Sequence, residues 1–396
     1  MTLLLAFSVI LLVAVLISGL AHRSVLSTAV LFLFAGFLLG DGMVGALDLQ
    51  AGDEVVTALA ELALFSVLFT DGQRVGLADL RAAWRLPGRA LLLGMPLTFF
   101  VTTLLGVWVA GLSWAEAMLV GAVLSPTDPV FAAAVVGREE VPGRLRHLLN
   151  VESGLNDGLA LPVVLVLLSV VGGPDAEYQP LLGELALGVG IGVAVPLVAV
   201  WLLRSRFTSA TSMYEALTPV AVGLIVLATA ELTHANLFLA AFAAGITIAT
   251  VAPELGAAFH GFGELVTELL KLAAILVFGA LISPTFLGQI PLSGYLFAVL
   301  ALFLARPAAI LVSFVGTRLP WPEQAAVAWF GPKGFASVVY GLIVLDSGTA
   351  GADEMFHLIA LAVVLSIVAH SSTDVPIAHY FARQEPSDAE WEANPA

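Results

Sequence analysis

The sequence predicts an all-α polytopic membrane protein of about thirteen transmembrane helices. Hydrophobic residues make up 60% of the 396 residues and charged residues only 11%. The mean hydropathy of +1.02 lies outside the range of soluble domains. Apolar stretches of about twenty residues, the length that crosses ~30 Å of hydrocarbon, recur along the chain. The cations lie in alternate connections between these stretches, as a membrane topology requires.

Thirteen apolar stretches account for most of the chain. The first has no basic segment before it and no convincing cleavage site before His22, so we expect a retained span and not a signal peptide. The expected spans are residues 3–21, 25–40, 54–71, 89–111, 115–136, 145–171, 180–203, 213–232, 235–252, 262–282, 292–316, 323–346 and 355–380.

The orientation follows from the charges. Twelve of the fifteen Lys and Arg residues follow odd-numbered spans, whereas loops after even-numbered spans carry Asp and Glu and no Lys or Arg. By the positive-inside rule we expect the odd loops in the cytoplasm, the N-terminus outside and the C-terminus inside, in the cell (inner) membrane. The excess of acids argues against nucleic acid as a partner. The absence of cysteine excludes disulfides and thiolate metal sites.

We interpret seven charged residues as intramembrane, which would cost roughly twenty kcal/mol if none were paired or hydrated. We therefore expect paired charges around a water-accessible cavity near the middle of the membrane. Lys271 shares a helical face with Glu264 and Glu268, which favours a solvated helix end over an entrance gate. The seven are Glu61, Asp128, Glu152, Asp157, Lys271, Arg306 and Lys333.

The stretch RHLLNVESGLNDGLALP, residues 146–162, concentrates polar groups in the sixth span. Ser153 and Asp157 are four residues apart and share one helical face, and Glu152 and Asn156 share the adjacent face. An acid inside a membrane is by default a functional residue.

Helix-breaking residues interrupt the fifth and twelfth spans. Pro126 and Pro129 bracket Thr127 and Asp128, and Lys333 lies in the sequence Gly-Pro-Lys-Gly. These spans are seven crossings apart, so spans 1–6 and 8–13 form inverted repeats joined by span 7. Two crossed discontinuous helices at matching places in inverted repeats indicate the binding site of a transporter.

Three stretches, SPTDPV, VESGLNDGLALP and GPKGFASVVYGL, resemble the core motifs of the monovalent cation/proton antiporter superfamily, in the sodium/proton exchanger branch with an Asn-Asp pair. The resemblance implies a homodimer in the lipid bilayer whose core domain moves against a dimerisation domain to alternate access. The implied dimerisation domain comprises residues 1–88 and 205–284, and the core comprises 89–171 and 285–382, with 172–204 as a linker span and 383–396 as a short cytoplasmic tail.

The resemblance also implies residue roles. Asp157 matches the aspartate that binds the cation and carries the proton, and Asn156 the asparagine before it. Glu152 would form a structural pair with Lys333, which stands where the family has arginine. Arg306 and Asp128 would offset the helix ends at the crossing. The residues expected to bind the ion or the proton are Asp157, Asn156, Asp128, Thr127, Ser153 and Glu61, and the Na⁺ ligands among them are Asp157, Ser153, Thr127 and Glu61.

The chemistry agrees with this interpretation. A hard monovalent cation prefers oxygen ligands, and a carboxylate that loses its proton when the cation enters couples the two fluxes by competition. Because Asn156 cannot titrate, we expect one proton per cation and electroneutral exchange, serving pH and sodium homeostasis. We therefore expect a Na⁺/H⁺ antiporter that also accepts Li⁺, is not an enzyme and uses no cofactor beyond the transported ions.

Three alternatives remain open at this point. The same ligands suit K⁺/H⁺ exchange. A cation channel would need a continuous pore without a titrating carboxylate, and Asp157 disfavours it. A hydrolytic enzyme would need Ser153 and His147 to meet, but their spacing of six residues puts them on different faces of one helix.

Overall fold

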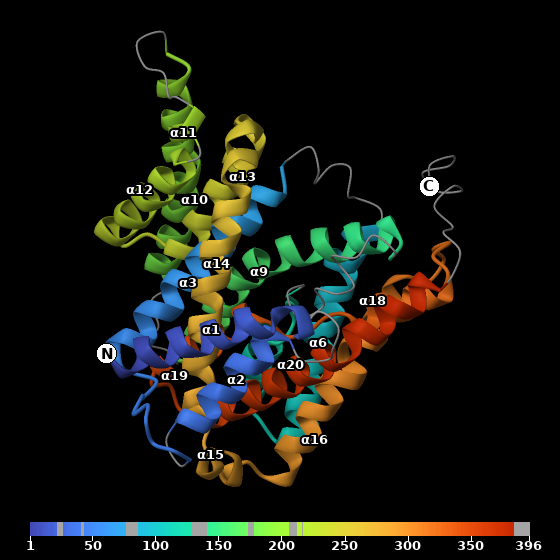
Figure 1. The fold of residues 1–396 in the computed structure, drawn as a ribbon. Helices are drawn as coiled ribbons and strands as arrows, with labels where there is room; N and C mark the ends of the chain where they lie inside the picture. Colours follow the sequence, from blue (N-terminus) through green and yellow to red (C-terminus); the bar gives the residue numbers. More distant parts are fainter. Residues whose placement is uncertain are drawn as a thin grey trace.

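The computed structural model describes residues 1–21, 27–40, 43–76, 86–128, 141–172, 178–205, 212–215 and 217–383. Every regular element within these ranges is helical (Figure 1). Seven of the described helices are long and apolar enough to cross a membrane, and five shorter helices are also apolar. The predicted fold class, an all-α polytopic membrane protein, is confirmed.

The first six expected spans each contain helix. Two short π-helical segments interrupt the fourth span, and the fifth begins with a capping box in which Ser113 N donates to Glu116 Oε2 at 2.8 Å. The elements are α1 (Thr2–Ala21), α2 (Thr28–Leu39), α3 (Glu54–Arg74), α5 (Leu86–Arg89), η1 (Ala90–Gly94), α6 (Met95–Leu105), η2 (Gly106–Ala110), α7 (Trp114–Val123) and α9 (Gly143–Val171).

The remaining seven spans are helical as well; the short helix α11 falls at the start of the expected eighth span, and the short helix α15 lies between two expected spans. The eleventh span, the repeat partner of the fourth, also contains a π-helical segment. The elements are α10 (Tyr178–Leu203), α11 (Ser212–Glu215), α12 (Thr218–Thr233), α13 (Leu237–Val251), α14 (Pro253–Leu281), α15 (Pro284–Gln289), α16 (Leu292–Leu300), η4 (Ala301–Ala305), α17 (Arg306–Ser313), α18 (Trp321–Trp329), α19 (Phe335–Asp346) and α20 (Ala352–Ala382).

The fifth and twelfth spans are discontinuous, as expected. Helix α7 ends at Val123 and residues 125–128 follow without helical structure, while Pro129, the second proline of the predicted break, lies outside the described residues. In the twelfth span, residues 330–334 separate α18 from α19. Both breaks free backbone groups inside the molecule.

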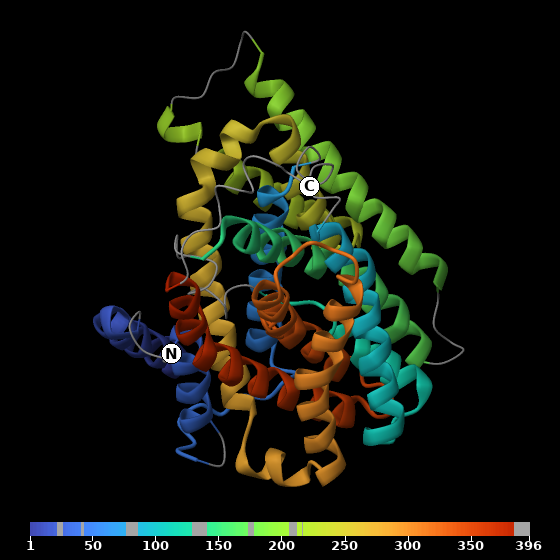
Figure 2. The same ribbon diagram turned by 90° about the vertical axis from the view of Figure 1, so that its right-hand side faces the viewer.

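The helices pack in two groups that meet at α9. In one group, α3 and α14 pack together with α2, α10, α12 and α13, and α14 runs almost the full height of the molecule (Figures 1 and 2). In the other, α6, α7 and α9 pack with the helices from α16 to α20. Helix α1 lies at the edge (Figure 2). The assignment of these groups as dimerisation and core domains stays a prediction.

Glycines allow the closest contacts in the first group. A Cβ on Gly36 of α2 would collide with the carbonyl oxygen of Leu276 on α14, and one on Gly279 with the carbonyl of Leu33. Gly72 of α3 makes the same kind of contact with α13. Membrane helices gain little from excluding lipid, so such backbone approach supplies much of their packing energy.

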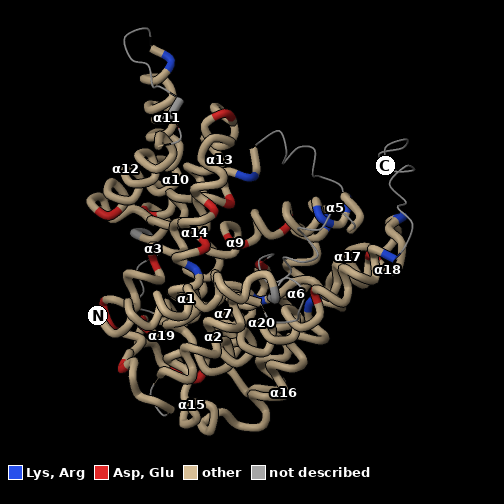
Figure 3. The backbone as a smooth tube through the Cα atoms, in the orientation of Figure 1, with Lys and Arg blue, Asp and Glu red and all other residues tan. Residues whose placement is uncertain are grey.

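Figure 3 shows charged residues both at the ends of helices and in the interior. At one end of the first group, Arg204 follows α10 and donates to the carbonyl of Val251 at 2.8 Å, close to the start of α14. Arg74 at the end of α3 also reaches α14. The ends of spans three, seven and nine therefore lie on one side of the molecule.

Candidate ion-binding site

Helix α9 carries four polar side chains into the interior. Glu152, Ser153, Asn156 and Asp157 are each no more than 3% exposed. Their neighbours on the helix are mostly apolar and also buried, so the helix crosses the interior with its polar face against another element. That element is the break after α7.

The break after α7 meets α9 through Thr127. The Ser153 hydroxyl donates to the Thr127 carbonyl, and the Asn156 amide donates to Thr127 Oγ1 at 2.7 Å. The proline at 126 and the end of α7 leave the Thr127 carbonyl outside any helix, so it is available to these side chains. Three of the predicted site residues thus lie in direct contact.

The two breaks cross and are joined by hydrogen bonds. Asp128 N donates to the carbonyl of Pro332 at 3.0 Å, and Phe335 N at the start of α19 donates to Asp128 Oδ2 at 3.3 Å. The Ser337 hydroxyl donates to the carbonyl of Val123 at the end of α7. The carboxylate of Asp128 therefore lies at the N-terminal, positive end of α19, as expected for a residue that offsets a helix dipole.

Two glycines in the second break make room for this crossing. A Cβ at Gly331 would overlap the Arg306 guanidinium, and a Cβ at Gly334 would overlap the side chain of Asp128. The Gly-Pro-Lys-Gly sequence is therefore explained by close approach on both sides of Lys333.

Glu152 does not pair with Lys333, which corrects the sequence-based prediction. Arg306 donates to both oxygens of Glu152, at 2.7 and 3.0 Å, while Lys333 Nζ is buried and makes no hydrogen bond to any described residue. The physical reason is the planar guanidinium, which fits a carboxylate with two parallel hydrogen bonds. Lys333 is held instead through its backbone, whose N–H donates to Ser366 Oγ at 2.7 Å.

Arg306 also faces the end of α18. Its Nη2 lies 3.4 Å from the carbonyl oxygens of Val327 and Phe330. These carbonyls belong to the last turn of α18 and the break, the negative end of a helix dipole. Arg306 thus compensates the end of one half-helix while it binds Glu152.

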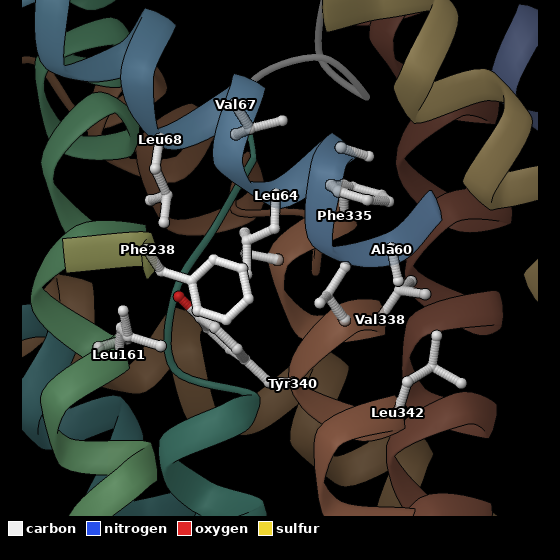
Figure 4. Packing of buried hydrophobic residues seen from close by; sticks show 14 of the residues in the cluster. Ala60, Leu64, Val67, Leu68, Leu161, Phe238, Phe335, Val338, Tyr340 and Leu342 are labelled. Carbon is white, nitrogen blue, oxygen red and sulfur yellow. The ribbon is translucent and has the colours of Figure 1, made fainter. Parts of the chain in front are cut away.

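The Asp157 carboxylate lacks a close polar partner among the described residues. No described residue donates a hydrogen bond to its side chain or lies within ion-pair distance; the Tyr340 hydroxyl donates instead to its backbone carbonyl at 2.8 Å. Figure 4 shows this tyrosine reaching from α19 toward α9 beside Phe238 and Leu161. The charged groups that act on Asp157 at longer range are Asp128, Asp71 and Lys271.

A family model for the transmembrane sodium/hydrogen exchanger matches residues 8–379. The chain belongs to the sodium/hydrogen exchanger family. The predicted family is therefore confirmed.

Relatives of this exchanger are named as antiporters. The K(+)/H(+) antiporter NhaP of Alkalimonas amylolytica is 25% identical over 395 residues, covering 97% of this chain and 68% of that protein. The K(+)/H(+) antiporter NhaP2 of Shewanella oneidensis is 26% identical over 376 residues, covering 91% of this chain and 64% of that protein. The exchanger thus spans about two thirds of the length of these relatives.

A solved structure has the same fold. The sodium proton antiporter MjNhaP1 from Methanocaldococcus jannaschii superposes with a TM-score of 0.76, covering 97% of this chain and 100% of that one. Sequence identity is 16%, so this likeness shows the fold alone.

In this exchanger Glu61 lies away from the site, contrary to expectation. It is half-buried on α3, and the charges that act on it are Glu231 and Asp346, at the ends of α12 and α19. Asp71 is ten residues further along α3, about 15 Å at 1.5 Å per residue. Asp71, and not Glu61, is the carboxylate of α3 that acts on Asp157.

Sequence reasoning missed two residues of this region of the exchanger. Asp71 lies at the predicted end of span three, where an acidic residue is common and does not by itself indicate a functional site. Lys271 was expected at a solvated helix end, yet it is 7% exposed and its Nζ lies 3.8 Å from Asp128 Oδ2. The signal that pointed to Lys271 was its place inside an apolar span, since an intramembrane cation needs a partner.

Proposed function

We propose that this chain exchanges a monovalent cation, Na⁺ in the first instance, for H⁺ at Asp157. The observation that carries the proposal is the contrast among three interior carboxylates. Asp71 pairs with Arg74 at 3.1 Å and Asp128 with Lys271 at 3.8 Å, whereas the Asp157 side chain has no hydrogen-bond donor and no cation within ion-pair distance among the described residues. A buried carboxylate in that position is costly until it takes up a proton or a cation.

Oxygen atoms around Asp157 support cation binding. The Thr127 carbonyl and the Ser153 hydroxyl are in contact with each other, and Asn156 Oδ1 is buried without a hydrogen bond among the described residues. Hard cations prefer carboxylate, carbonyl and hydroxyl oxygens. We propose that Asp157, Ser153 and Thr127 supply ligands to the cation and that Asn156 braces the break. Asp128 would act on the ion electrostatically.

Competition at one carboxylate would couple the fluxes. A proton and a cation cannot both bind Asp157, so each round trip carries one in each direction, and the transport is electroneutral. No cofactor takes part in this scheme. The core domain of spans 4–6 and 11–13 would move against the dimerisation domain of a homodimer, carrying the crossing and α9 together.

The identity of the cation has two candidates. The fold neighbour MjNhaP1 is described as a sodium proton antiporter, and the two relatives are described as K(+)/H(+) antiporters. We keep Na⁺ as the first candidate because of the description of that fold neighbour, and K⁺ as the second because of the names of the relatives.

The proposed orientation follows from the arginines. Spans three, seven and nine end on one side, next to Arg74 and Arg204. We propose that this side faces the cytoplasm of the cell membrane, with the N-terminus outside and the C-terminus inside.

Transport by the purified protein in proteoliposomes tests the proposal. Na⁺, Li⁺ or K⁺ added outside should drive protons across the membrane, and the rate should not change when the membrane potential is set to different values. A cation flux without proton movement would instead indicate a channel. The order of rates among the three cations identifies the substrate.

A further inference from the structure

Arg74, the last residue of α3, joins an inner carboxylate to an outer one. Its Nη1 lies 3.1 Å from Asp71 Oδ1, one turn back along α3. Its Nη2 lies 2.7 Å from Glu264 Oε1 on α14, and His260 Nε2 lies 3.3 Å from the same oxygen. The side chains of Arg74 and Glu264 are more than a third exposed, whereas that of Asp71 is 13% exposed. The guanidinium therefore stands between the surface and the interior.

A surface cavity of about 240 Å³ lies beside this bridge, between α3, α13 and α14. Arg74 lines it together with Thr70, Gln73, Phe259 and His260. A volume of this size holds several water molecules, so a hydrated cation can occupy it. The cavity is lined by both polar and apolar residues, and the Arg74 side chain forms part of its wall.

Asp71 connects the bridge to the ion-binding site. A Cβ built on Gly154 of α9 would lie 3.8 Å from the backbone oxygen of Asp71, so α3 and α9 are in contact there. Gly154 follows Ser153 and is three residues before Asp157. The charge of Asp71 acts on Asp157. Cavity, Arg74, Asp71 and Asp157 therefore follow one another inward.

We propose that Arg74 gates the route by which the cation passes between this cavity and Asp157. The inference rests on the proposed function, because it concerns access to the same site. With the guanidinium bound to both carboxylates, a cation in the cavity meets a positive charge. When Arg74 leaves Glu264, the acids become available to the cation and the route opens.

A purely structural role for Arg74 makes a different prediction. Ion pairs between exposed side chains contribute little to stability. If the bridge only held α3 against α14, its removal would leave access to the interior unchanged or would loosen the whole fold. A gate residue, by contrast, changes access at positions just behind it and nowhere else.

The chain contains no cysteine, so single cysteines can be introduced without removing native ones. Gly154 is buried on α9 beside Asp71, behind the bridge, and a Cβ there meets only Val75 and Asp71 at ordinary van der Waals distances. The experiment compares labelling of Gly154→Cys by a membrane-impermeant thiol reagent with and without Arg74→Gln, in oriented vesicles that expose the arginine side. We expect Arg74→Gln to speed labelling about tenfold, the factor that loss of a charge-assisted hydrogen bond allows. Glu264→Gln should act in the same direction.

Two controls separate a gate from general loosening. Arg204→Gln removes another arginine on this side, paired at 3.5 Å with the exposed Glu254, and should leave labelling of Gly154→Cys unchanged. Ala360→Cys, fully buried in α20, should stay unlabelled in the Arg74→Gln background. Equal labelling of Gly154→Cys with and without Arg74→Gln would overturn the proposal, as would labelling at both cysteines.

Transport supplies a second measurement. Arg74→Gln removes a positive charge near the site, so the apparent KM for the cation presented on the arginine side should fall about threefold or more. If labelling is faster but the KM is unchanged, Arg74 controls access to the site without repelling the cation. That result would overturn the electrostatic part of the proposal. Labelling does not depend on transport, so failure of the exchange proposal, in which wild type moves no protons, is distinguishable from failure of the gate.

Discussion

Arg306 binds Glu152 through two hydrogen bonds, of 2.7 and 3.0 Å, in a part of the molecule where both side chains are almost fully buried. The same guanidinium faces the carbonyl oxygens at the end of α18. One arginine therefore fixes α9 and the first half of the twelfth span relative to α17. The crossing next to Asp157 depends on the position of both.

Removing one partner of this pair should destabilise the protein strongly. Arg306→Met leaves the Glu152 carboxylate buried and unpaired, which we expect to cost about 3–5 kcal/mol. The double variant Arg306→Met, Glu152→Met should regain much of that loss, because neither charge remains. Thermal unfolding of the detergent-solubilised protein checks both. A double variant no more stable than the single one would show that the pair is not what holds this region.

Lys333 should behave differently although it lies in the same motif. Its Nζ has no hydrogen bond among the described residues, and its contact with the fold is through its backbone N–H. Lys333→Met removes a buried charge without breaking a pair, so the unfolding temperature should stay the same or rise. If Lys333→Met destabilised the protein as much as Arg306→Met, the Glu152–Lys333 pair predicted from the sequence would be supported after all.

Gly334 tests the close approach at the crossing. Gly334→Ala places a methyl group on Asp128, and we expect a loss of about 1–3 kcal/mol and a marked loss of transport. Gly288→Ala is the matched control, since a Cβ there meets no atom within 4 Å. Unfolding and proton transport should be measured for both variants. A Gly334→Ala protein with wild-type behaviour would contradict so close a contact between the two breaks.

We expect Asp71, and not Glu61, to contribute to cation binding. Because Asp71 acts on Asp157, Asp71→Asn should raise the apparent KM for the cation, by about tenfold for one charge lost near a partly hydrated site. Glu61→Gln should change it little, because Glu61 lies near the ends of α12 and α19. Initial rates of cation-driven proton movement at several cation concentrations give both values. The reverse order would reinstate Glu61 as a site residue.

The spans and the breaks could be predicted from the sequence because each depends only on neighbouring residues. The membrane thickness sets the length of a span, and proline and glycine set the breaks. The helix in residues 145–171 and the interruption around Lys333 needed only neighbouring residues. The grouping of Ser153, Asn156 and Thr127 followed from the motif resemblance, and the structure brings these three residues together.

The partners of the buried charges could not be predicted this way. Arg306 is 27 residues from Lys333, and the choice between them for Glu152 depends on how α17 crosses α9. Glu61 and Asp71 are both acids of one helix, and only the contact of α3 with Gly154 selects Asp71. Lys271 was placed by its neighbours along α14, but its partner Asp128 comes from the far half of the chain.

A comparison of wild type with Asp157→Asn in proteoliposomes tests whether Asp157 couples cation and proton transport. Proton movement should be recorded on addition of Na⁺, Li⁺ and K⁺, after circular dichroism and size-exclusion chromatography show that the variant is folded. Wild type should exchange at least one of these cations for protons and Asp157→Asn none, because asparagine can neither carry the proton nor offer a charge to the cation. Continued cation/proton exchange by a folded Asp157→Asn protein would contradict this role of Asp157, and Asp71 or Asp128 would then have to carry the proton.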